Sequence, residues 1–327
     1  MPSIRRILVA IKNPAARSSP ALTKATQLAR ALGARLELFH AIATPQYVDP
    51  YAPAGMALLA DLEKKSEERL LRSLEKAAAS ARRLRIHASA SVVRDYPVFE
   101  AILRRAARIK ADLIVTDSHS RQHLAAGLLH LTDWELLRRS PVPVLIVKGA
   151  RAYGRPVVLA ALDPQHRFSK PSRLDDRILR AASTVTRALR GTLHAVHAFP
   201  PLIQDGFMRR LDVIERLDAQ RAAEARRALD RTLGSTRIPP ARRHVLERNP
   251  AEAITEMAAR LKSSLVVMGA VSRSGLKRML IGNTAESALD FLNCDILIVK
   301  PAHFRQRVSS RVRGARLVGV AGATPYF

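Results

Sequence analysis

One segment in the second half of the chain carries residue types that could bind a phosphate group. It follows a short apolar run and combines glycines with hydroxyl, amide and basic side chains. Glycine lets the backbone approach a ligand closely, and free amides at the start of a helix bind anions. Basic side chains would add counter-charge. The residues concerned are Met268, Gly269, Ser272, Arg273, Lys277, Gly282, Asn283 and Thr284.

The same segment has a purely structural interpretation. Asn283 could cap the helix that follows while Glu286 reaches back to it, a capping box that uses the same amides. A strand-to-helix turn alone would then account for the pattern. Both interpretations remain open on the residues alone.

Similar strings recur at a nearly constant offset along the chain, which is the signature of a duplicated unit. Val144-Leu-Ile-Val-Lys148 returns as Ile296-Leu-Ile-Val-Lys300, and Glu100-Ala-Ile102 returns as Glu252-Ala-Ile254. In each copy, short apolar runs alternate with helical patterns, as expected for parallel strands covered on both faces. We therefore predict an α/β fold of two tandem, doubly wound, five-stranded parallel sheets.

The repeat also predicts the domain boundaries. The first domain, here called the first copy, spans residues 1–149, and the second copy spans residues 156–301. The remaining residues, 302–327, contain several arginines and no acid, which is typical of a flexible basic tail.

The glycine loop and the strings around it resemble the universal stress protein family, in particular its tandem E-type branch. The strings are Thr132 to Lys148, Gly282 to Glu286 and Cys294 to Pro301. The resemblance implies an internal pseudo-dimer with Val144 to Val147 beside Ile296 to Val299. It also implies ATP or AMP as a ligand of the second copy, with Asp163 after its first strand contacting the base or ribose. Ser272 and Asn283 depart from the glycine and hydroxyl residues of the family's loop.

The first copy lacks these features. Lys12 stands where the second copy has Asp163, and Asp117 stands where it has Gly269. Asp133 adds a negative charge where a phosphate would arrive, and two like charges about 4 Å apart repel by about 4 kcal/mol at an effective dielectric of 20. We predict no nucleotide in the first copy.

Composition limits the remaining possibilities. A single cysteine excludes an internal disulfide, and no apolar run is long enough for a membrane span, so we expect a cytoplasmic protein. The histidines do not group at metal-ligand spacing, and no catalytic constellation stands out. We therefore expect a stress-response protein that is not an enzyme, beyond at most very slow nucleotide hydrolysis, and that acts through conformation, partners or self-association.

Two alternatives remain open. The ligand could instead be a lipid-like metabolite, and the protein would then serve as a scaffold. The residues that could line an apolar cavity for it are Tyr47, Tyr51, Phe207 and Met208. Alternatively, the net charge of +27 could attract nucleic acid, although aromatic residues are only 4% and do not alternate with basic ones.

Overall fold

The structure is a computed structural model. It describes residues 4–16, 18–43, 53–118, 131–165, 173–202, 212–234, 236–270, 288–289, 291–302 and 304, without the side chains of residues 53–60, 131 and 212. Most of the predicted basic tail and the larger part of the predicted phosphate loop fall outside these residues.

Over its described residues, the first copy contains five strands and four helices in strict alternation, as its apolar runs predicted. Its elements are β1 Arg6–Ala10, α1 Pro20–Leu32, β2 Arg35–Ile42, α2 Pro53–Arg83, β3 Ala88–Arg94, α3 Val98–Ile109, β4 Leu113–Asp117, α4 Leu131–Arg139 and β5 Val144–Val147.

The second copy repeats this order as far as β9, with one additional 3-10 turn, and between β9 and β10 the described residues 288–289 and 291 are helical. Its elements are β6 Val157–Leu162, α5 Leu174–Ala188, β7 Thr192–Phe199, α6 Asp212–Leu233, the turn η2 Pro240–Arg242, β8 Arg243–Glu247, α7 Pro250–Arg260, β9 Leu265–Gly269 and β10 Asp295–Val299.

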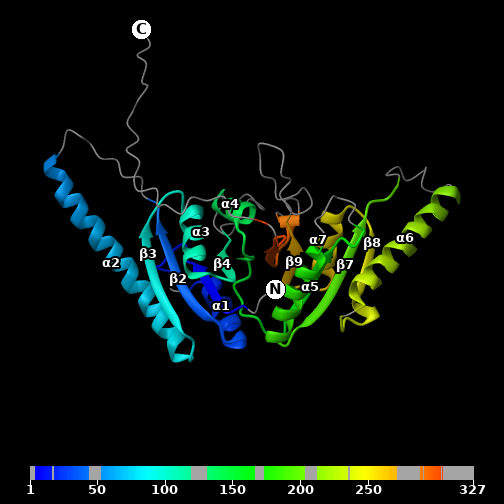
Figure 1. Cartoon of the computed structure of the whole chain (residues 1–327), viewed down its shortest axis with the longest axis horizontal. Coiled ribbons are helices and arrows are strands. Elements are labelled where there is room, and N and C mark those ends of the chain that lie inside the picture. The colour runs from blue at the N-terminus through cyan, green and yellow to red at the C-terminus, as the bar shows by residue number, and fades with distance from the viewer. Residues whose placement is uncertain are drawn as a thin grey trace, which may run out of the picture.

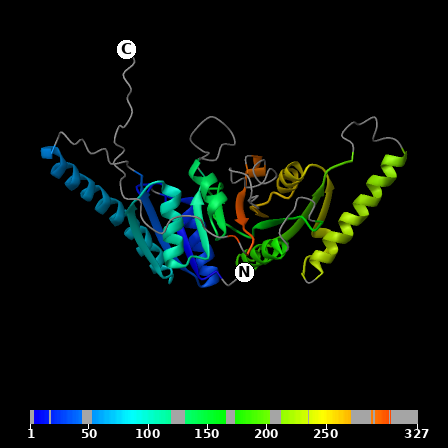
Figure 2. The same cartoon turned by 45° about the horizontal axis from the view of Figure 1, so that its top comes forward.

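All the strands belong to one ten-stranded sheet in the order β3-β2-β1-β4-β5-β10-β9-β6-β7-β8. Strands are parallel within each copy, and the copies meet where β5 runs antiparallel to β10, with Leu145 opposite Leu297. This seam confirms the predicted internal pseudo-dimer. Figures 1 and 2 show the resulting elongated molecule, with α2 at one end and α6 at the other.

Helices cover both faces of the sheet, as its continuous apolar strands require. One hydrophobic core lies between the sheet and helices α1, α2, α5 and α6, and includes Leu28, Leu74 and Ile178. A second core lies on the opposite face, under α3, α4 and α7, and includes Leu103 and Met257. Both cores run through the two copies without interruption.

Local sequence signals fix the helix ends. Ser19 caps α1 by accepting a hydrogen bond from the amide of Leu22, and Pro20 takes the first helical position. Gly33 ends the same helix at a φ of 65°, a left-handed conformation that favours glycine.

A buried polar cluster ties the seam together. The Asp295 carboxylate, fully buried at the start of β10, accepts hydrogen bonds from Lys24 Nζ at 2.5 Å and Tyr153 Oη at 2.6 Å. It also accepts from the amides of Lys148 and Gly149 at 2.9 Å. A carboxylate of the second copy is thus satisfied by donors of the first copy and of the segment that joins the two.

Candidate functional site

Two of the residues predicted to bind nucleotide meet at one edge of the sheet in the second copy. Asp163 directly follows β6, and Gly269 ends the adjacent parallel strand β9, where Ala160 pairs with Val267. The carboxyl ends of neighbouring parallel strands are where open α/β sheets bind ligands. Met268 precedes Gly269, but its side chain is 3% exposed and packs in the core, so only its backbone faces this edge.

Gly269 has a packing role that the sequence did not suggest. A Cβ atom at this position would lie 2.7 Å from Leu174 Cδ2 and 3.2 Å from Ile178 Cδ1. Contacts below about 3 Å are not tolerated between carbon atoms, because the repulsive part of the van der Waals potential dominates there. Glycine therefore allows the first turn of α5 to approach the end of β9.

The first turn of α5 also contacts the predicted site. The amide of Asp163 donates a hydrogen bond to Asp175 Oδ1 at 3.2 Å, and Asp175 is 5% exposed. Nearby, Gln165 Oε1 is a buried oxygen with no hydrogen-bond partner among the described residues. A buried acceptor without a partner is unfavourable, so this oxygen is available to a donor on a ligand.

The other predicted contacts lie outside the described residues. They are Ser272, Arg273, Lys277, Gly282, Asn283 and Thr284, and their roles remain predictions.

The corresponding edge of the first copy is occupied by an ion pair. Lys12 Nζ, just after β1, lies 2.9 Å from Asp133 Oδ1 and 3.2 Å from Oδ2. The Asp133 side chain is fully buried, whereas that of Lys12 is 24% exposed. Burial lowers the pKa of Lys12, and the carboxylates of Asp133 and Asp117 oppose that shift.

The sequence suggested that the negative charge of Asp133 would repel a phosphate. In the structure this charge is paired and is not free to do so. Lys12 compensates it, and the pair links the end of β1 to α4. The sequence reasoning missed this pairing because 121 residues separate its two members.

Asp117 closes the same edge from β4. Its Oδ1 accepts from the amide of Ala21 at 2.7 Å, and its Oδ2 accepts from Ser19 Oγ at 2.8 Å. The start of α1, which an anionic ligand would approach, is thus capped by a carboxylate of the protein itself. In the second copy the equivalent residue is Gly269, which has no side chain.

The fold defines a tandem protein of the doubly wound α/β type, in which two copies join through their last strands. The sequence model described as "Universal stress protein family" matches residues 3–148 and 158–300. The chain belongs to the universal stress protein family.

Several relatives support this assignment. Universal stress protein E of Escherichia coli K12 is 31% identical over 221 residues, which cover 64% of this chain and 67% of that protein. Universal stress protein E of Photorhabdus laumondii is 24% identical over 326 residues, covering 93% and 97% of the two chains. A solved structure titled as a putative universal stress protein from Pseudomonas aeruginosa UCBPP-PA14 has a TM-score of 0.70 at 27% identity, covering 92% of this chain and 94% of that one.

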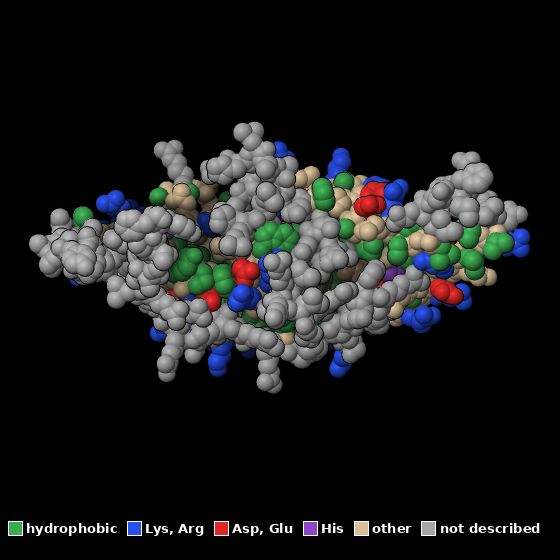
Figure 3. Space-filling view, turned by 90° about the horizontal axis from the view of Figure 1, so that it is seen from above, with side chains coloured by type: hydrophobic (Ala, Val, Ile, Leu, Met, Phe, Trp, Pro, Cys, Tyr) green, Lys and Arg blue, Asp and Glu red, His purple; other side chains and the backbone are tan. Residues whose placement is uncertain are grey.

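Two kinds of feature are absent from the described residues. None of their helices combines the length and the apolar character that crossing a bilayer requires. Within the same residues, three or more histidine, cysteine or acidic side chains do not come together in a way that could hold a metal ion. In the view from above, arginine and lysine side chains line the rim of both copies (Figure 3).

Proposed function

We propose that this member of a stress-response family binds an adenine nucleotide, ATP or AMP, in the second copy and not in the first. Its output would be a change of conformation or of partner rather than turnover. Asp163 would contact the base or ribose, and Gln165 Oε1 would accept a hydrogen bond from the ligand. The phosphates would meet the amides and basic side chains of the segment from Gly269 to Thr284.

The observation that carries this proposal is the difference between the two corresponding edges. In the first copy, Lys12, Asp117 and Asp133 satisfy one another or a helix end. In the second copy, glycine replaces Asp117 and a buried side-chain oxygen, Gln165 Oε1, has no protein partner among the described residues. Polar groups left unsatisfied at the carboxyl edge of such a sheet favour a ligand there.

Equilibrium titration with ATP and with AMP tests the proposal. We expect saturable binding by the parent protein, with one site per chain. Asp163→Ala should weaken the affinity about tenfold or more, because loss of a hydrogen bond to a charged acceptor is worth about 1.5–3 kcal/mol. Lys277→Ala should weaken ATP binding more than AMP binding, since its charge would face the terminal phosphates.

The matched control is Asp61→Ala, which removes an exposed carboxylate from α2 of the first copy. It should leave the affinity unchanged. Gly269→Ala is unsuitable as a probe, because its Cβ would displace α5 whether or not a ligand binds.

Native mass spectrometry of the freshly purified protein separates this proposal from the lipid-like alternative. The residues named for that alternative, Tyr47, Tyr51, Phe207 and Met208, lie outside the described residues. A bound mass equal to that of a nucleotide supports our proposal. A bound lipid mass, together with no saturable binding of ATP or AMP in the titration, would refute it.

A further inference from the structure

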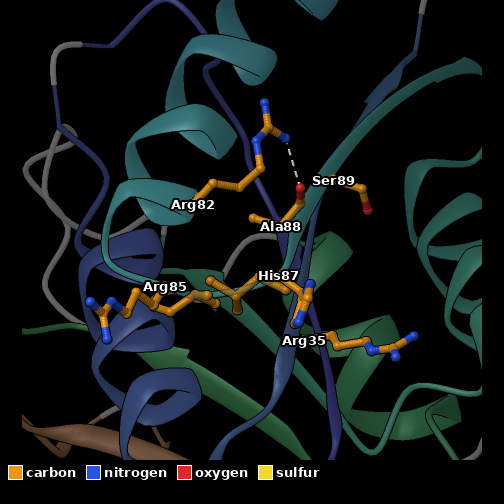
Figure 4. Close-up of a pocket in the computed structure, with 8 residues that line it drawn as sticks. Arg35, Arg82, Arg85, His87, Ala88 and Ser89 are labelled. Carbon is orange, nitrogen blue, oxygen red and sulfur yellow. Dashed lines mark hydrogen bonds between the residues drawn. The ribbon is translucent and has the colours of Figure 1, made fainter.

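A basic cavity lies on the opposite side of the first copy from the nucleotide edge, at the amino ends of β2 and β3. Its volume is about 530 Å³. The polar residues that line it are Arg35, Arg82, Arg85, His87 and Ser89, and the rest of its lining is apolar, with no acidic side chain. Figure 4 shows that the arginines come from three elements: the end of α2, the turn after it, and the start of β2.

Only part of this positive charge is compensated. Arg82 is held in place by the carbonyl of Ala88 at 2.7 Å and by Glu75 Oε2 at 3.1 Å. Arg35 and Arg85 are exposed, and neither forms an ion pair within the part of the chain that the structure describes. The cavity therefore presents two uncompensated guanidinium groups beside a third that is fixed by the fold.

Every non-glycine residue that the structure describes in the left-handed conformation is basic, and four of the five lie on this side. The fifth, Arg173, precedes α5 at the opposite edge. Where a helix ends in the left-handed conformation, glycine is the usual residue, as at Gly33. Four other helix ends carry a basic residue in that conformation, although a side chain is unfavourable there. They are Arg85 after α2, Lys110 after α3, Arg190 after α5 and Lys262 after α7, with φ values of 61°, 52°, 52° and 49°.

The helix macrodipole does not explain this choice. A cation near the carboxyl end of a helix is favourable, but basic residues in the last turns of these helices already supply it. They are Arg82 and Arg83 in α2, Arg108 in α3, Arg187 in α5 and Arg260 in α7. The left-handed residues add charge beyond that need, on the side where the strands begin. In Figure 1, α2 and α6 both end on this lower side of the molecule.

The arrangement of the charges indicates the kind of partner. Figure 4 shows the guanidinium groups of Arg35, Arg82 and Arg85 spreading outward in different directions instead of converging on one point. Such an arrangement suits an extended polyanion better than a single compact phosphate. Arginine also forms paired hydrogen bonds with phosphate oxygens, which favours a chain of phosphodiesters.

A membrane surface fits less well than a nucleic acid. Peripheral membrane binding combines basic residues with apolar side chains that enter the lipid. Between the end of α2 and the start of β3, only Leu84, 48% exposed, is a large exposed hydrophobic residue. One such side chain offers little apolar surface to a lipid. Few aromatic residues are present in the chain, so base stacking contributes little.

We propose that this basic face of the first copy, centred on the cavity of Arg35, Arg82, Arg85 and His87, binds the phosphate backbone of nucleic acid without reading its sequence. The proposal is independent of the nucleotide proposal, because the two sites lie at opposite ends of the strands and in different copies.

The test uses the full chain and a fluorescein-labelled 30-base-pair DNA duplex of random sequence, with binding followed by anisotropy over a range of NaCl concentrations. The informative variant is Arg35→Ala/Arg85→Gly, because glycine suits the left-handed conformation at residue 85 and should not impair folding. Each lost phosphate contact makes the negative slope of log K against log salt shallower by about 0.9. We therefore expect the magnitude of the slope to fall by about 1.8, and the affinity to be at least about tenfold weaker near 0.1 M salt.

The control is Arg69→Ala/Arg216→Ala, which removes the same charge from exposed positions on α2 and α6 away from the strand starts. It should retain the parent slope. Equal losses in both double variants would show that net charge alone matters and would overturn the proposal. So would loss of binding only on deletion of residues 303–327, absence of salt-dependent DNA binding by the parent, or binding to phosphatidylglycerol vesicles in place of DNA.

Discussion

After the first strand of each copy, the chain places Lys12 in one case and Asp163 in the other. Lys12 joins Asp133 in an ion pair whose carboxylate is completely buried, while Asp163 is half-buried and contacts α5 through its own amide. After the fourth strand, Asp117 caps α1, whereas Gly269 only makes room for α5. The charged side chains at this edge are therefore paired within the protein in the first copy, whereas fewer such contacts form at the corresponding edge of the second copy.

The contrast extends beyond this edge. In the first copy, Arg104 lies between Asp95 at 2.6 Å and Glu100 at 2.9 Å, and all three residues are buried. The seventh residue of the corresponding helix α7 is Glu256, which pairs with Arg248 at 2.9 Å. At this helix position the second copy thus has an acid where the first has a base, and its ion pair is exposed instead of buried. We interpret the first copy as the structural member of the duplication, in which charged side chains at this edge and in α3 pair with one another. Under the proposed function, the second copy is the member that binds a ligand.

The largest expected effect tests the buried network directly. Arg104→Ala should lower the free energy of unfolding by about 3–5 kcal/mol, because it leaves the carboxylates of Asp95 and Glu100 buried without their cation. Glu256→Ala, at the corresponding position of the second copy, should lower it by less than about 1 kcal/mol, since both partners there are largely exposed.

Urea denaturation at neutral pH, followed by circular dichroism, measures both variants under the same conditions. Similar losses for the two would contradict the contrast between a buried and an exposed pair. An Arg104→Lys variant separates charge from geometry, because it keeps the cation but not the fork that contacts both acids.

A smaller effect is expected at the seam, where Lys148 follows β5 and Lys300 follows β10. Lys148 Nζ donates to the carbonyls of Leu289 and Leu292 at 2.6 and 2.8 Å. Lys300 Nζ is buried, has no hydrogen-bond partner among the described residues, and lies 4.9 Å from the ring centre of Phe304. Burial lowers the pKa of Lys300 to about 7.

Lys300→Met should therefore stabilise the fold at pH 7, by about 2–4 kcal/mol, because it removes a buried amine that is hard to charge. Lys148→Met should destabilise it by about 1–3 kcal/mol through the two lost hydrogen bonds.

In the parent, the unfolded chain holds a proton on Lys300 that the folded chain releases above pH 7. Stability should then rise between pH 7 and about 10.5, and Lys300→Met should remove that rise. Denaturation at pH 6, 7, 8 and 9 measures both effects, and an unchanged pH slope would contradict the assignment.

The sequence was informative about the scaffold because the repeat and the apolar runs depend on local periodicity. It predicted the alternation of strands and helices, and the resemblance it carries implied that Val144 to Val147 would lie beside Ile296 to Val299. It was less informative about the site. The pairing of Lys12 with Asp133 and the packing of Gly269 against Leu174 depend on contacts between distant segments, which no local pattern encodes.

The smallest predicted effect concerns a pair of histidines on the last two strands of the sheet in the second copy, β7 and the edge strand β8. His194 Nδ1 lies 3.0 Å from His244 Nε2, and their rings stack. At the corresponding positions of the first copy, Ser91 Oγ donates to Glu37 at 2.9 Å. Burial, followed by the nearby His194, Arg260 and Arg226, lowers the pKa of His244 to about 4.

Because the folded-state pKa of His244 lies below the ordinary value of 6.5, the unfolded chain takes up a proton there before the folded chain does. Stability should therefore fall as the pH drops from about 6.5 to about 4. His244→Ser, which installs the first copy's residue type, should reduce that fall by about 1 kcal/mol, since the half-exposed ring is partly screened by solvent. Ser91→Ala, which changes no titrating group, sets the background for a substitution at this position. If His244→Ser and the parent lost stability equally over this range, the histidine pair would not be the source of the pH dependence, and this difference between the copies would have no energetic consequence.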